Sequence, residues 1–116
     1  MAVSHLIKEP AFFAKFKVTP ENAFAIYAED EAMADFIIHG DIMIFDKSRT
    51  APRNGKIFAV DYLGKLHIRQ LWIEADGSWL LESRSPNKDA YPDQRFSADQ
   101  LGSLRICGEF IYRQGG

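Results

Sequence analysis

The sequence predicts a mainly β domain, a barrel or sandwich of several short, strongly twisted strands with little helix. Apolar runs of strand length recur along the chain, turn residues separate them at roughly ten-residue spacing, and no long stretch has a helical period. The 116 residues fit one domain, and 47% of them are hydrophobic, so the chain can bury a core.

The predicted elements begin after a lead-in. Residues 1–20 are interpreted as an N-terminal arm or lead-in, because their aromatic residues fit neither helical nor strand spacing, and residues 21–116 as the folded domain. The first predicted strand, residues 24–28, places large side chains on one face at period two. An acidic, alanine-rich turn follows, and a turn at Gly40 precedes an apolar strand over residues 42–45.

The second half of the chain continues this pattern. The pair Asn54-Gly55 is a strong turn signal. The strand after the next turn alternates almost perfectly, so Leu66, Ile68 and Leu71 are expected to face the core. The predicted strands cover residues 56–62, 65–73, 79–83 and 104–112, with one helical turn over residues 97–101.

Charge and cysteine content narrow the classes of function. The formal net charge is −2 and the pI is about 5.9. These values argue against direct binding of this segment to a nucleic-acid backbone, which needs a concentrated positive charge. Cys107 is the single cysteine, so a reducing, cytoplasmic location is expected rather than a disulfide-stapled secreted fold. No apolar run suits a signal peptide or a membrane span, and we predict no metal and no cofactor.

Six short segments occur in one order with compatible spacing. They are residues 30–35 (DEAMAD), 40–46 (GDIMIFD), 54–60 (NGKIFAV), 66–71 (LHIRQL), 81–92 (LESRSPNKDAYP) and 106–113 (ICGEFIYR). Their order resembles the LexA-type autopeptidase domain, the family of LexA, UmuD and lambda-type phage repressors. Each segment alone is a weak signal, and the six together imply the LexA/signal-peptidase-like β fold.

The resemblance also implies that this chain has lost the family's self-cleavage reaction. Members of the family cleave themselves with a serine that is activated by a lysine, whose pKa is lowered by burial. Here the serine position holds Ala32, which has no nucleophilic atom, and the lysine position holds Arg69, whose guanidinium stays protonated. The scissile Ala-Gly or Cys-Gly bond is also missing, since no glycine precedes Gly40. We therefore expect no self-cleavage, and we expect Ala32 and Arg69 to lie close together.

Two interpretations of Arg69 stay open. In the first, its guanidinium forms an ion pair across the former active site with an acid such as Glu29, Asp30 or Glu31. In the second, it binds the carboxylate of a peptide. We favour the ion pair.

Other polar residues are weaker candidates. A metal site requires His39, Asp41 and His67 to converge, and surface or turn histidines are the simpler interpretation. Asp35 and Asp41 could act as paired carboxylates, but turn and cap positions explain them equally well. The remaining candidates are Ser48, Ser83 and Ser85, which have no obvious base, and Cys107, which is expected to be buried.

The leading hypothesis is the non-cleaving dimerisation and regulatory domain of a phage-type, LexA/CI-like transcriptional repressor. In the family this domain pairs two DNA-binding heads, so we expect a homodimer, with DNA bound only through a separate domain absent from this chain. The chain is then either part of a longer repressor, which we favour, or a short stand-alone protein of the UmuD kind. An antirepressor or another regulatory protein would replace self-cleavage as the switch.

The last strand is the expected dimer interface. A terminal strand often lies at a sheet edge and presents unpaired N–H and C=O groups, and Gly108 allows a bend or a close approach. Phe110 and Tyr112 are expected to share one face. The interface residues named on this basis are Ile106, Phe110, Ile111 and Tyr112.

Two alternatives come from other classes of protein. One is an active Ser/Lys autopeptidase whose dyad is misaligned, and alkaline incubation would reveal its fragments. The other is a UmuD-like accessory subunit of a polymerase, which a pull-down with the polymerase would reveal.

Overall fold

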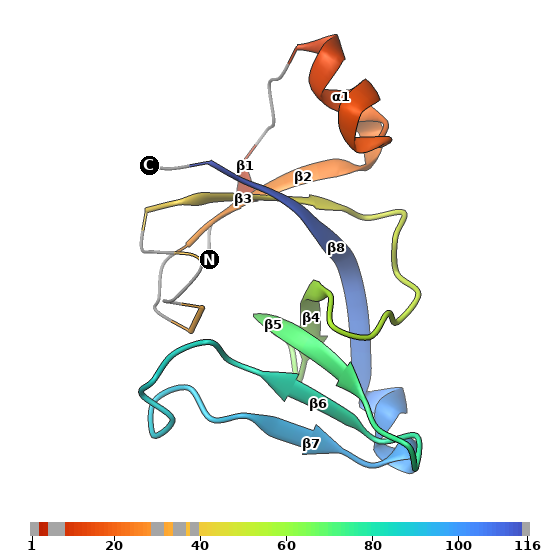
Figure 1. The fold of residues 1–116 in the computed structure, drawn as a ribbon, viewed down its shortest axis with the longest axis vertical. Coiled ribbons are helices and arrows are strands. Elements are labelled where there is room, and N and C mark those ends of the chain that lie inside the picture. Colours follow the sequence, from red (N-terminus) through yellow and green to blue (C-terminus); the bar gives the residue numbers. More distant parts are fainter. Residues whose placement is uncertain (1–2, 5–8, 29–31, 34–36, 38–39, 115–116) are drawn as a thin grey trace.

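The computed structural model describes residues 3–4, 9–28, 32–33, 37 and 40–114, and these residues form one long antiparallel sheet (Figure 1). The strand order is β1-β2-β3-β8-β4-β5-β6-β7. The strands are β1 (Val3–Ser4), β2 (Ala23–Tyr27), β3 (Ile42–Asp46), β4 (Ile57–Tyr62), β5 (Lys65–Ile73), β6 (Trp79–Glu82), β7 (Gln94–Phe96) and β8 (Leu104–Gln114). The prediction of a mainly β fold with little helix is confirmed.

Three short helical segments accompany the sheet. The 3-10 segments η1 (Pro20–Asn22) and η2 (Ala98–Ser103) precede β2 and β8, and η2 matches the helical turn predicted from the sequence. The α-helix α1 (Pro10–Phe16) was not predicted. Pro10 suits the first helical position because its fixed φ is already helical, and Lys17 ends the helix in the left-handed region at φ 54°.

Two hydrophobic cores lie on opposite faces of the β4–β5 hairpin. Ile68 belongs to the first core, and Leu66 packs against that core. Leu71 belongs to the second, with Phe58 and Leu81. Because successive strand residues point to opposite faces, the three residues expected to share one core are divided between two.

The strand β8 joins the two halves of the sheet (Figure 1). Its residues 104–109 pair with β4 and its residues 109–114 pair with β3, so β8 is central in the strand order. The prediction of a terminal edge strand is therefore wrong. A strand at the end of the chain need not lie at the edge of the sheet, because strands from earlier in the chain can pair with both of its sides.

Two register shifts in β8 change which side chains share a face. Ile44 pairs with Tyr112, whereas the adjacent Phe45 pairs with Phe110. Since neighbours on β3 point to opposite faces, Phe110 and Tyr112 also point to opposite faces, and the expectation that they share one is wrong. A second shift against β4 lies beside Gly108, where an added Cβ would approach the carbonyl oxygen of Asp46 to 2.9 Å.

Candidate functional site

Ala32 is buried against the segment that follows β6. Its side chain is 1% exposed, and its carbonyl oxygen accepts a hydrogen bond of 2.7 Å from the backbone N–H of Arg84. The next residue, Met33, packs in the first core with Ile68. Ala32, which the sequence resemblance assigns to the nucleophile position, is therefore held on the sheet by backbone and core contacts, and its methyl group is buried.

Arg69 is buried on β5. It lies directly opposite Phe58 on β4, its side chain is 7% exposed, and its Nη1 donates to the carbonyl oxygen of Ile68 at 2.8 Å. Its neighbour Gln70 accepts a hydrogen bond of 3.2 Å from Arg84 Nη1. Through its backbone and its side chain, Arg84 therefore connects Ala32 to the residue after Arg69. The expected closeness of Ala32 and Arg69 stays a prediction.

The acids proposed as partners of Arg69 lie outside the described residues. They are Glu29, Asp30 and Glu31. The choice between an internal ion pair and a bound peptide carboxylate therefore remains open.

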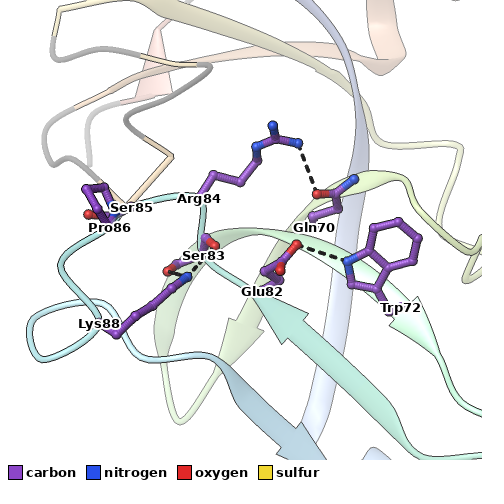
Figure 2. Close-up of a pocket in the computed structure, with 8 residues that line it drawn as sticks. All are labelled: Gln70, Trp72, Glu82, Ser83, Arg84, Ser85, Pro86 and Lys88. Atoms are coloured by element: carbon purple, nitrogen blue, oxygen red, sulfur yellow. Dashed lines mark hydrogen bonds between the residues drawn. The ribbon is translucent and has the colours of Figure 1, made fainter.

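A solvent-facing pocket of about 750 Å³ lies beside these residues (Figure 2). Gln70 and Trp72 of β5 and Glu82 of β6 form its strand side, and the chain after β6 forms the rest. Trp72 Nε1 donates to Glu82 Oε1 at 3.1 Å, and Gln70 Nε2 donates to the carbonyl oxygen of Gly55 at 3.1 Å. The lining residues are Gln70, Trp72, Glu82, Ser83, Arg84, Ser85, Pro86 and Lys88.

The pocket contains a serine and a lysine in contact. Lys88 Nζ lies 3.0 Å from Ser83 Oγ, and Figure 2 shows the two side chains directed at each other. Lys88 also donates to the carbonyl oxygen of Ser83 at 2.8 Å and to Asp93 Oδ1 at 3.0 Å. The Ser83 hydroxyl donates to the carbonyl oxygen of Tyr91 at 2.6 Å.

This contact fastens the loop and does not form a catalytic dyad. A general base must accept the proton of its nucleophile, but the Ser83 proton is directed at Tyr91 and Lys88 is an ammonium donor paired with Asp93. Ser83 is also 1% exposed. The sequence prediction named no base for Ser83 and did not single out Lys88, although the five-residue spacing between them was the available signal for their contact.

The other serine and aspartate candidates are engaged in local structure. Ser48 Oγ donates to Asp46 Oδ1 at 2.6 Å, and Ser85 Oγ accepts from the backbone N–H of Asn87 at 3.1 Å. Asp41 is 1% exposed and accepts from Arg113 Nη1 at 3.2 Å, so it ties the ends of β3 and β8 together.

The described histidine and cysteine candidates lie on β5 and β8. His67 lies on β5 opposite Val60. His5, Asp35 and His39 lie outside the described residues, and among the residues that are described no three His, Cys, Asp or Glu side chains gather to hold a metal. Cys107 is a free, half-buried thiol that packs against the first core.

The four residues named for the interface have different surroundings within the chain. Ile106 packs against the second core, and Phe110 packs against the first with its ring 5.9 Å from that of Phe45. The Tyr112 ring lies 5.4 Å from the ring of Phe12 in α1. Ile111 sits at the register shift between the two halves of the β3 pairing.

Comparison with known proteins identifies the family of this chain. Residues 1–111 match the family model described as Peptidase S24-like, and the chain belongs to that family. A curated relative is 26% identical over 89 residues, which is 77% of this chain and 34% of the relative. It is the HTH-type transcriptional regulator PrtR of Pseudomonas aeruginosa (strain PAO1), so the chain spans about a third of that protein. Within the described residues, no helix is long and apolar enough to cross a membrane.

Proposed function

We propose that this chain is the non-cleaving dimerisation and regulatory domain of a transcriptional repressor. The observation that carries the proposal is the pair of residues at the family's dyad positions, a buried alanine at 32 and a buried arginine at 69. A methyl group cannot attack a carbonyl, and a guanidinium stays protonated at ordinary pH and cannot accept a proton. The chain keeps the scaffold of the peptidase and lacks both reacting groups.

A peptidase scaffold without its reacting groups can still associate with a second copy of itself. Residues 104–109 of β8 pair with β4 and residues 109–114 pair with β3, and the register shift in the second pairing falls at Ile111. Ile111 is half-buried, and its side chain is the part of β8 that we propose contacts a second copy. A two-fold pairing through residues 110–114 would join two copies symmetrically, as reading a palindromic operator requires.

DNA binding belongs to a separate domain in this proposal. The net charge of −2 leaves the chain without the positive field that phosphate binding needs. The relative whose name includes a helix-turn-helix is about three times as long as the matched region. A protein of this kind works in the cytoplasm, and without self-cleavage it needs a regulatory partner, such as an antirepressor, to switch it off.

Alkaline incubation tests the loss of peptidase activity. A Ser/Lys autopeptidase cleaves faster at high pH because its lysine is then neutral more often. We expect mass spectrometry to find the native chain intact. Ser83→Ala is the matched control, because Ser83 is the described serine that contacts a lysine. Fragments that form in the native chain and vanish in Ser83→Ala would establish the autopeptidase alternative instead.

Light scattering at micromolar concentration tests self-association. The native chain should have the mass of a dimer, and Ile111→Asp should give a monomer, because it places a charge at the pairing half of β8. Ile73→Asp is the matched control, since Ile73 is 38% exposed on β5. Phe110→Asp is unsuitable, because Phe110 packs against the first core. A monomeric native chain, or equal effects of both substitutions, would refute pairing through β8.

A further inference from the structure

The helix α1 packs on Tyr112 of β8, and Figure 1 shows the helix beside β2 at the top of the view. The rings of Phe12 and Phe16 each lie 5.4 Å from the ring of Tyr112, and they lie 4.7 Å from each other. Tyr112 pairs with Ile44, whose face of β3 is opposite to that of Phe45 and the first core. The helix therefore covers the face of the sheet that the first core leaves uncovered.

Arg49 fastens the C-terminal end of this helix to the sheet. Its Nη2 donates to the carbonyl oxygen of Phe16 at 2.8 Å and to that of Lys17 at 3.3 Å. Carbonyl groups at a helix end lack partners within the helix, so a guanidinium there satisfies them directly. The same side chain lies 3.0 Å from Asp46 Oδ2, which is 1% exposed at the end of β3.

A second arginine completes the charge cluster without touching the helix. Glu109, which is 4% exposed on β8, lies 3.8 Å from Arg49 Nη1 and within 3.1 Å of Arg53 Nη1. Two buried carboxylates thus hold Arg49 in place beneath the helix end. Arg53 binds the same carboxylate, and its side chain is 53% exposed.

The burial of the helix is shallow. None of its seven residues is buried, and no side chain caps its N-terminal end. Lys17 follows it at φ 54°, a conformation that non-glycine residues adopt at a cost. Short segments with few buried contacts open before the rest of a domain unfolds.

We propose that α1 is a releasable strap on the sheet and that Arg49 is the latch that keeps it closed. Release of α1 exposes the ring of Tyr112 while both cores stay intact. A regulatory role for this release rests on the proposed function. The helix lies beside the half of β8 that we propose pairs with a second copy. The latch itself does not depend on that pairing.

Hydrogen exchange on the full chain tests the latch. The informative amides are those of Lys17 and Val18, which donate to the carbonyl oxygens of Ala14 and Phe13. In Arg49→Gln these amides should exchange about tenfold faster or more, because a charged hydrogen bond to the helix end is lost. Amides of the β4–β5 hairpin should exchange at the native rate. Arg53→Gln is the matched control and should leave the strap amides within about twofold of native.

A second variant separates release of the strap from disturbance of the charge cluster. Tyr112→Ala removes the ring on which the helix packs and leaves Arg49, Asp46 and Glu109 in place, so it should also accelerate the strap amides selectively. No acceleration in Arg49→Gln, or equal acceleration in strap and hairpin, would overturn the latch. Exchange is read whether or not the chain dimerises, so failure of the latch and failure of the proposed self-association are distinguishable.

Discussion

The backbone N–H of Arg84 donates a hydrogen bond of 2.7 Å to the carbonyl oxygen of Ala32. This contact joins residues 52 positions apart in the sequence and holds Ala32 beside a residue that lines the pocket. The Arg84 side chain extends the link to Gln70, next to Arg69. Positions 32 and 69, the two proposed dyad positions, are therefore connected through Arg84 and Gln70, and substitutions at them test the proposal directly.

Ala32→Ser restores a hydroxyl at the nucleophile position without restoring a base. We expect this variant to remain uncleaved on alkaline incubation, because Arg69 cannot take the proton and no glycine precedes Gly40 to form the family's scissile bond. Mass spectrometry after timed incubation checks the result. Fragments from Ala32→Ser alone would show that a base other than Arg69 reaches position 32.

Gly108→Ala should destabilise the domain by about 1–3 kcal/mol, the usual cost of forcing a methyl group into a filled space. The added Cβ would lie 2.9 Å from the Asp46 carbonyl oxygen and 2.9 Å from Phe24 Cε1. Gly102→Ala is the control, because nothing lies within 4 Å of its Cβ position. Urea unfolding measures both variants, and equal stabilities would contradict the close approach at Gly108.

Asp46→Ala should lower the free energy of unfolding by about 2–3 kcal/mol, because it leaves charged and polar donors without their acceptor. Asp46 accepts from the backbone N–H and the hydroxyl of Ser48, and it pairs with Arg49. Asp61→Ala is the control and should cost less than about 1 kcal/mol, as exposed pairs do. Asp61 is 33% exposed and lies 3.5 Å from the exposed Arg105.

The pKa of Asp76 is lowered from its usual 3.8 by the hydroxyl and the backbone N–H of Ser78. A depressed pKa in the folded chain means that Asp76 stabilises the fold above pH 3.8 and that this contribution is lost as pH falls through the folded value. In Ser78→Ala the pKa of Asp76 should rise toward 3.8, as a carboxyl titration by NMR would detect. Asp99, whose low pKa comes from Ser97, should not move.

The sequence determined the fold class, because strand periodicity and turn residues are local properties. The alternation over residues 65–73 gave β5 at Lys65–Ile73, and the turn pair Asn54-Gly55 preceded β4 as predicted. The ordered segments also predicted the family to which the chain belongs. The lost dyad stays a sequence prediction that depends on the alignment of Ala32 and Arg69 with the family's serine and lysine. Its chemical basis is that a methyl group is not a nucleophile and a guanidinium is not a base.

Tertiary structure alone decided how distant segments share faces and edges. The placement of β8 between β3 and β4, and the register shifts that send Phe110 and Tyr112 to opposite faces, depend on pairings that no local pattern encodes. The same holds for α1, a short helix that packs on Tyr112 and is capped by Arg49. The local sequence of α1 is a weak helix signal, and its stability comes from contacts with residues that are distant in the sequence.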